Sequence, residues 1–177
     1  GISKAHSAGG WRLGFMHAPR ELSHMIGPLK AFMSETTSCV SSPIQYASIE
    51  AYQDTDNMLK YLDRCNRVHE AVTKYVWESL VGLGLECPSP KGGYYLSPSF
   101  RKYKQQLKKI GITDDKTLSM YLLSHYGIAT LPGCDFYFNP EQFILRLALV
   151  DYDGKKAYDD IDILSADDFI DTLKYVK

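Results

Sequence analysis

The most informative stretch of the chain is its first, GISKAHSAGGWRLG, residues 1–14. Lys4 lies among small residues, where a ligand can approach the backbone closely. Gly9 and Gly10 permit backbone conformations that other residues avoid, so a turn there would return Arg12 to the neighbourhood of Lys4. A converging amine and guanidinium suit a ligand with an aldehyde and a phosphate, because a lysine of lowered pKa forms a Schiff base and arginine holds phosphate by charge-assisted hydrogen bonds. Spacing alone favours the alternative, an exposed glycine-rich loop.

A second charged residue stands out in QFILRLALV, residues 142–150. Arg146 is the one charge among the otherwise apolar positions 143–150, which read as a strand. Burying an unpaired guanidinium is costly, so Arg146 requires an anion, and its forked donors fit a carboxylate. The more common explanation of such an arginine is an ion pair with an Asp or Glu of the same chain.

The clearest helical pattern covers residues 54–83. Apolar residues recur there at three- and four-residue steps, which is typical of one buried helix face. The stripe consists of Met58, Leu62, Cys65, Val68, Val72, Val76 and Leu80. Gly82 and Gly84 are expected to end this helix. A helix of this length often joins two lobes, so we place the domain boundary along it.

Weaker patterns predict the remaining elements. Helices are expected over residues 20–26, 29–33, 44–52, 101–109, 116–126, 155–161 and 166–175. The first two are expected to be separated by a break at Gly27-Pro28. Strands are expected over residues 12–16, 94–97, 128–131 and 142–150, and residues 34–42 are expected to form a loop. Irregular alternation of strands and helices favours an α/β or α+β lobe.

Composition excludes several classes of protein. The 177 residues carry 20 Lys+Arg against 21 Asp+Glu, a balance that argues against nucleic-acid binding by phosphate neutralisation. No apolar run approaches the roughly 18 residues that cross a bilayer, and the first residues lack a signal-peptide layout, so no membrane partner is expected. The 4 cysteines form no C-x-x-C pair, so we expect neither a metal site nor a disulfide framework, and a cytoplasmic location.

The first fourteen residues resemble the lysine signature of the class I/II pyridoxal-phosphate-dependent aminotransferases, which have fold type I. That signature runs small–apolar–small–Lys and ends in Gly-x-Arg-apolar-Gly, and residues 1–4 and 10–14 match it. The resemblance implies that Lys4 is the catalytic lysine and forms the Schiff base with pyridoxal 5'-phosphate, and that Arg12 binds the cofactor phosphate. Gly1 stands where many relatives have a phosphate-binding serine, and Ser3 or backbone N–H groups are expected to take over part of that role.

Later blocks resemble the same family in the same order. The segment PGCDF, residues 132–136, and the arginine ten residues later look like the family's late block, where an arginine grips the substrate α-carboxylate. This implies that Arg146 binds substrate. Residues 92–96 resemble the strand that follows the long helix, and residues 38–47 resemble the segment that precedes it.

The resemblance implies the C-terminal half of an α/β enzyme, with the end of the large cofactor lobe at residues 1–53 and the small lobe at 54–177. In relatives the acidic partner of the pyridine nitrogen, an aromatic ring on the cofactor and a phosphate loop precede the lysine, so an N-terminal half is an expected partner and the fragment is expected to be inactive alone. The implied activity moves an amino group between an L-amino acid and a 2-oxo acid in a homodimer. Two alternatives stay open: a carbon–sulfur lyase of the same fold, and a non-catalytic α/β module that binds another protein.

Overall fold

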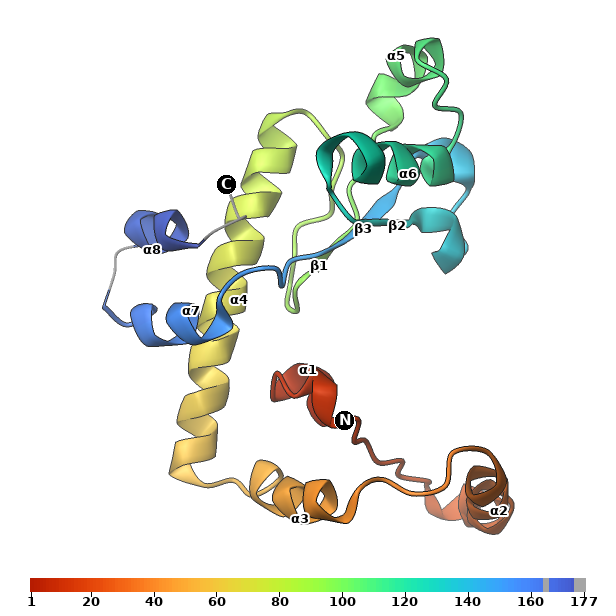
Figure 1. Ribbon diagram of the computed structural model, residues 1–177, viewed down its shortest axis with the longest axis vertical. Coiled ribbons are helices and arrows are strands. Elements are labelled where there is room, and N and C mark those ends of the chain that lie inside the picture. Colours follow the sequence, from red (N-terminus) through yellow and green to blue (C-terminus); the bar gives the residue numbers. More distant parts are fainter. Residues whose placement is uncertain (164–165, 174–177) are drawn as a thin grey trace. The chain divides into compact units, whose positions relative to one another are not determined.

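The computed structural model describes residues 1–163 and 166–173. The chain forms two compact units, Gly1–Cys65 and Asn66–Lys177. The boundary between them falls inside the long helix α4, Asp56–Gly82 (Figure 1). The predicted lobes, residues 1–53 and 54–177, are parts of the fold expected for a longer enzyme, and this division stays a prediction.

The regular elements of the first unit, among its described residues, are all helices and 3-10 turns. It contains α1 (Ile2–Ala5), α2 (Ile26–Thr36), α3 (Ser42–Ala51) and the start of α4, with 3-10 turns at Gly9–Trp11 and Arg20–Met25. His6 ties the ends of three of these helices together. Its Nε2 lies 2.7 Å from the carbonyl oxygen of Ala51, and its own carbonyl accepts a hydrogen bond of 2.9 Å from the Tyr61 hydroxyl.

The predicted strand over residues 12–16 is wrong. Arg12 has the left-handed φ of 56°, and the segment that follows it is irregular. A strand is stable only beside another strand, and the described residues of this unit contain none. The Ile2 N–H donates a hydrogen bond of 3.3 Å to the Leu13 carbonyl, which ties this segment to α1.

The predicted break at Gly27-Pro28 is also wrong, because α2 runs through both residues. Pro28 falls in the first turn of this helix, where its missing N–H has no helical acceptor in any case. The helix continues to Thr36 and so includes the first residues of the loop expected over 34–42. The hydroxyls of Thr36 and Thr37 donate to the carbonyls of Phe32 and Met33, which satisfies the end of the helix within a Ser/Thr-rich run.

The second unit has its first core around α4. The predicted long helix is confirmed, and Gly84, with a φ of 79°, follows its end. The helix packs its apolar stripe against α7 (Gly154–Asp160) and α8 (Ala166–Thr172). The buried members of this core are Val68, Val72, Ala157, Phe169, Ile170 and Leu173. The predicted helix over 155–161 is confirmed as α7, and the end of the one predicted over 166–175 lies outside the described residues.

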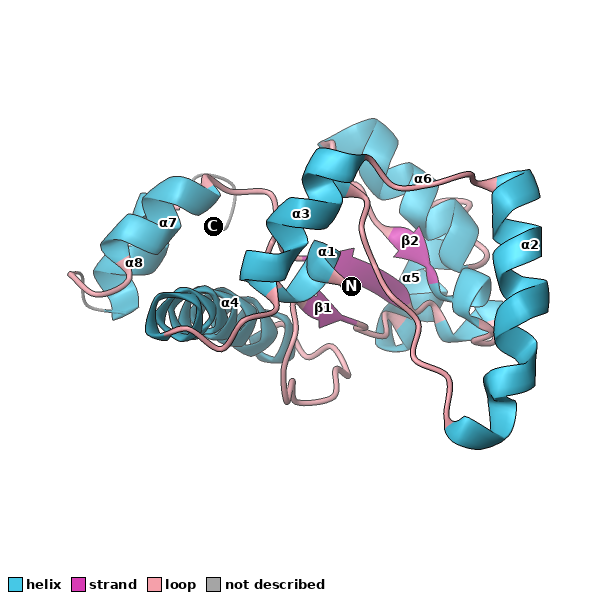
Figure 2. Cartoon of the chain, turned by 90° about the horizontal axis from the view of Figure 1, so that it is seen from below, coloured by secondary structure: helices cyan, strands magenta, loops and turns pink. Residues whose placement is uncertain are grey.

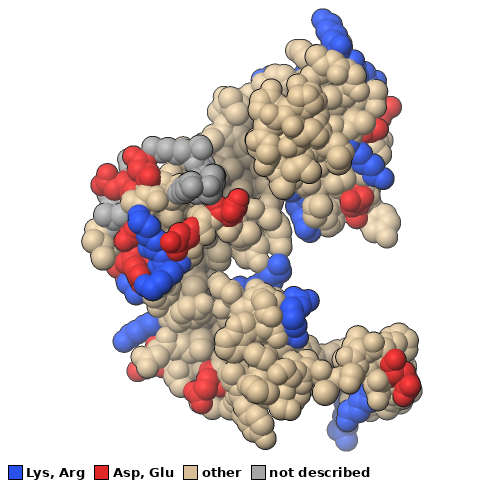
Figure 3. Space-filling view, in the orientation of Figure 1, with Lys and Arg blue, Asp and Glu red and all other residues tan. Residues whose placement is uncertain are grey.

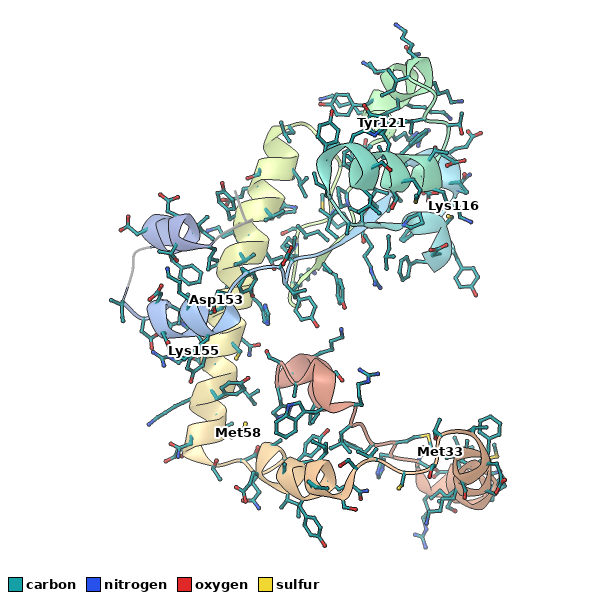
Figure 4. All side chains as sticks on the ribbon, viewed as in Figure 1. Met33, Met58, Lys116, Tyr121, Asp153 and Lys155 are labelled. Atoms are coloured by element: carbon teal, nitrogen blue, oxygen red, sulfur yellow. The ribbon has the colours of Figure 1, made fainter. Side chains whose placement is uncertain are left out.

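Charged side chains on α7 follow helical spacing. Lys155 pairs with Asp159 and Lys156 with Asp160, each four residues apart, so basic and acidic atoms lie side by side over this helix (Figure 3). Asp153, at the start of the helix in Figure 4, accepts a hydrogen bond of 3.0 Å from the Lys156 N–H and caps it.

The second core lies between a small sheet and α6 (Asp115–Tyr126), with α5 (Lys104–Lys109) nearby in sequence. The sheet is antiparallel, with three strands in the order β1-β3-β2 (Figure 2). The strands are β1 (Tyr95–Leu96), β2 (Leu131–Pro132) and β3 (Leu145–Ala148). Ile112 and Leu118 pack there against Phe143 and Leu145, which are fully buried.

Three of the predicted strands are shorter than expected, and the one over 94–97 is reduced to β1, Tyr95–Leu96. Phe143 has a left-handed φ of 51° after a 3-10 turn at Pro140–Gln142, so β3 cannot begin before Ile144. Residues 128–130 lie outside the sheet, and the Ile128 N–H donates to the Leu122 carbonyl just beyond Gly127, the C-cap of α6. In the part of the chain that the structure describes, no helix is both long and apolar enough to cross a bilayer.

Candidate functional site

The two ends of the lysine turn, residues 1–14, lie close together. Lys4 lies exposed in the last turn of α1. The Ile2 carbonyl accepts hydrogen bonds from the N–H groups of His6 and Ala8, which draws the chain after the lysine back onto the helix. A Cβ on Gly1 would lie 3.1 Å from the Leu13 carbonyl oxygen, so the first residue approaches the end of the same turn closely.

The expected turn at Gly9-Gly10 forms, but the glycines do not supply its unusual dihedral angles. Gly9 and Gly10 lie in a 3-10 turn, and the left-handed positions are Ser7, with a φ of 53°, and Arg12, with a φ of 56°. Arg12 is therefore held as the C-cap of that turn. Its Nη1 donates a hydrogen bond of 2.9 Å to the Gly9 carbonyl.

The Arg12 side chain lines a pocket of about 790 Å³. Beyond the bond to Gly9, Arg12 has no ion pair or hydrogen bond with the residues that the structure describes. The hydroxyl-bearing residues Thr37, Ser38 and Ser41 line the same pocket, with Met33 of α2 on its wall (Figure 4). A cation beside hydroxyls suits a phosphate-like anion. Lys4 is not among the residues that line this pocket.

Arg146 lies in the second unit, on β3, among aromatic rings. Its guanidinium carbon lies 4.7 Å from the centre of the Tyr95 ring and 4.2 Å from the centre of the Phe136 ring. Its Nε is buried without a hydrogen-bond partner. Within residues 1–163 and 166–173 no Asp or Glu pairs with Arg146, so the ion pair that would have explained it within the chain is not found there.

Two elements bring the rings to the arginine. Tyr95 lies on β1, which pairs with β3, and Phe136 ends the Gly133–Phe136 turn, a 3-10 turn after β2. The Gly133 N–H donates to the Ile144 carbonyl at 2.8 Å and fixes the start of this turn against the strand. A Cβ on Gly133 would lie 2.9 Å from both the Cβ and the carbonyl oxygen of Ile144, so the approach requires glycine.

The sequence did not indicate that Tyr95 and Phe136 contact Arg146, although both residues lie in the segments that resemble the family, 92–96 and 132–136. A ring over the face of a guanidinium leaves the N–H donors free, because they point outward in its plane. Forked, planar donors of this kind suit a planar anion. Among the described residues, no group of three or more His, Cys, Asp or Glu side chains is placed to hold a metal ion.

Comparison with known proteins decides the family. Residues 1–152 match the model of "Aminotransferase class I and II". The chain belongs to this family. The family is pyridoxal-phosphate-dependent, and both the predicted membership and the predicted cofactor class are confirmed.

Among curated proteins, this aminotransferase chain is 34% identical over 137 residues to a probable N-acetyl-LL-diaminopimelate aminotransferase of Bacillus subtilis, covering 77% of the chain and 31% of that protein. It is 32% identical over 136 residues to an aspartate aminotransferase of Pyrococcus abyssi, covering 77% of the chain and 32% of that protein. The chain thus spans about a third of the length of these relatives.

Among solved structures, the chain resembles the aromatic aminotransferase of Pyrococcus horikoshii. The TM-score is 0.69 at 26% identity, over 92% of this chain and 39% of that one. The predicted fold class, α/β with part of fold type I, is confirmed by this likeness.

Proposed function

We propose that this chain is the C-terminal part of an aminotransferase that moves an amino group between an L-amino acid and a 2-oxo acid. The observation that carries the proposal is Arg146, whose guanidinium lies against two rings and whose Nε is buried without a partner. A buried donor without a partner is rare in native proteins and marks a place where a ligand completes the site. In an enzyme of this family, an amino-acid carboxylate fits that place.

Lys4 is the proposed catalytic residue. When bound, pyridoxal 5'-phosphate supplies an aldehyde and a ring that accepts the negative charge left on the substrate α-carbon. The Lys4 Nζ, exposed at the end of α1, would hold the cofactor through its aldehyde and would carry the proton that the substrate α-carbon loses.

Arg12 is the proposed phosphate ligand, and Ser3 a supporting one. The fit rests on the free donors of Arg12 and the hydroxyl-bearing residues that line its pocket. Ser3 is half-buried on α1, one residue before the lysine. The narrow space beside Gly1, where a Cβ would already lie 3.1 Å from a carbonyl oxygen, accounts for a glycine in place of a larger residue there.

The proposal includes an N-terminal half and a second subunit as partners, with lobes at residues 1–53 and 54–177. The stretch that matches this chain makes up about a third of each relative, and the first unit exposes many large apolar side chains that a partner surface would cover. These include Trp11, Phe15, Met16, Phe32, Tyr46 and Ile49. This exposure supports a partner that covers the first unit, and we propose that the fragment alone is inactive. The 4 cysteines are free thiols, which supports a reducing, cytoplasmic location.

Borohydride trapping in the complete enzyme tests the role of Lys4. Reduction should fix the cofactor to the peptide that contains Lys4, and Lys4→Ala should abolish both the adduct and turnover. Lys30→Ala, which removes an exposed lysine of α2, is the matched control and should keep both. An adduct that survives in Lys4→Ala would overturn the assignment, and keto-acid release from thioether amino acids without an amino acceptor would indicate a carbon–sulfur lyase.

A further inference from the structure

Asp115 is a fully buried carboxyl group without a role in the site described so far. It is the first residue of α6, and its exposed fraction is 0%. Its Oδ2 accepts a hydrogen bond of 2.7 Å from the Cys134 N–H, and its Oδ1 is buried without a partner. It forms no ion pair with any lysine or arginine in the described part of the chain. Burying a carboxyl group with a single hydrogen-bond partner costs free energy of folding. The stability of α6 alone therefore does not explain an aspartate at this position.

Asp115 does not cap the helix that it begins. The neighbouring Asp114 does so: its carboxylate accepts a hydrogen bond of 2.8 Å from the Thr117 N–H, and the Thr117 hydroxyl accepts one from the Asp114 N–H. The helix end is thus satisfied without Asp115. The hydrogen bond of Asp115 instead crosses to the Gly133–Phe136 turn, nineteen residues later in the chain.

The Gly133–Phe136 turn depends on a few polar ties. Its start is fixed to β3 by the Gly133 N–H, and its second residue is held by Asp115. Its last residue, Phe136, is 37% exposed, so the ring is not enclosed in a core and the backbone of the turn contributes to its position. The hydrogen bond at Cys134 lies close to this ring, because only Asp135 separates Cys134 from Phe136 along the chain.

Phe136 connects this tie to substrate binding. Its ring centre lies 4.2 Å from the Arg146 guanidinium carbon, within the range of cation–π attraction. A ring that covers a guanidinium face restricts the rotation of that group and directs its in-plane donors. Loss of the tie would let the turn and the ring move, and Arg146 would sample orientations that do not meet a carboxylate.

We propose that Asp115 is a positioning residue for Arg146, acting through the Cys134 N–H and the Phe136 ring. The inference rests on the proposed function of Arg146 as the substrate carboxylate ligand. Asp115 itself touches neither substrate nor cofactor. Asp115 restricts the orientation of the Arg146 guanidinium, so loss of the Asp115 carboxyl group should weaken substrate binding more than it slows the chemistry at Lys4.

Steady-state kinetics of the complete enzyme test this proposal. Asp115→Ala should raise KM for the amino acid and for the 2-oxo acid by about ten-fold, the effect of losing one charge-assisted hydrogen bond, while kcat falls far less. Asp115→Asn keeps an oxygen that accepts the Cys134 N–H and should restore most of the affinity. Asp114→Ala is the matched control: it removes the cap of the same helix and should lower thermal stability while KM stays unchanged.

A double-mutant cycle separates positioning through Phe136 from a general effect. Phe136→Leu should raise KM to a similar extent, and Asp115→Ala combined with Phe136→Leu should cost clearly less than the two single effects together. Should Asp115→Ala not fold, Asp115→Glu, which displaces the carboxyl group by one methylene, replaces it in the cycle. Full additivity, or an unchanged KM in Asp115→Ala, would overturn the inference.

The outcome for Arg146 distinguishes this failure from failure of the proposed function. If Arg146→Ala leaves KM unchanged, the proposed carboxylate site itself is wrong. If Arg146→Ala raises KM but the Asp115 and Phe136 variants do not, only the positioning role of Asp115 is wrong.

Discussion

Gly133→Ala should destabilise the second unit and weaken substrate binding, because the added methyl group meets β3. The new Cβ would lie 2.9 Å from the Cβ of Ile144 and 2.9 Å from its carbonyl oxygen. Carbon atoms in contact lie about 3.5–4.0 Å apart, so the turn and the strand must separate by more than about half an ångström. That same carbonyl accepts the Gly133 N–H at 2.8 Å, and the separation stretches this hydrogen bond.

The expected net cost of Gly133→Ala is about 1–3 kcal/mol. Overpacking a well-packed site costs about 1–3 kcal/mol, and a lost hydrogen bond adds about 0.5–1.5 kcal/mol. Reduced freedom of the unfolded chain returns about 0.4–1 kcal/mol, since Gly133 is not among the glycines with positive φ. The turn carries Phe136, so the displacement should also raise KM.

Native-state hydrogen exchange measures this effect locally in the complete enzyme. The Leu145 N–H, which donates to the Pro98 carbonyl at 3.1 Å in the sheet core, should lose protection in Gly133→Ala. Gly82→Ala is the matched control, because nothing lies within 4 Å of its added Cβ at the end of α4, and it should leave Leu145 protected. Wild-type protection and KM in Gly133→Ala would refute the reasoning about the turn.

Two further predictions concern the second unit. Arg146→Lys keeps the charge but loses the planar fork, so KM for the amino acid should rise about ten- to hundred-fold in the complete enzyme; an unchanged KM would count against bidentate binding. Burial lowers the pKa of His69, whose Nδ1 lies 3.2 Å from the Tyr152 hydroxyl oxygen, so its neutral form is favoured in the folded state. Its contribution to stability is complete above its ordinary pKa of about 6.5 and is lost as the pH falls through the lowered value. The melting temperature should therefore drop on acidification below about pH 6.5, and less so in His69→Gln; equal slopes in both proteins would exclude this role.

The long helix and α6 were predictable because local sequence determines them. The apolar steps from Met58 to Leu80 require one helix face whatever packs against it. Gly127, with a φ of 70°, ends α6 at the residue where the sequence placed the stop. Such signals act within one or two turns of the chain, so they need no knowledge of the tertiary fold.

Elements that depend on distant partners were not predictable in the same way. Residues 12–16 have strand-like composition, but pairing decides whether a strand forms, and the first unit offers no neighbour among its described residues. The helix start was placed at Lys116, so Asp115 and its bond to Cys134 were missed. An Asp-Asp pair before an apolar run shows that one residue caps the helix, but not where the second carboxyl group points.

The surroundings of Arg146 fit its proposed role, because aromatic rings suit a substrate-binding cation better than a protein carboxylate would. A carboxylate of the chain would pair with the guanidinium strongly, and substrate would have to displace it at the full cost of breaking a buried ion pair. Tyr95 and Phe136 instead stabilise the cation by about 0.5–2 kcal/mol each and leave its in-plane donors available. The unpartnered Nε is then the energetic cost that remains in the free protein, and binding of a carboxylate relieves it. Substituting Arg146 by leucine should accordingly abolish substrate binding with little loss of stability, a separation of effects that a structural ion pair would not show.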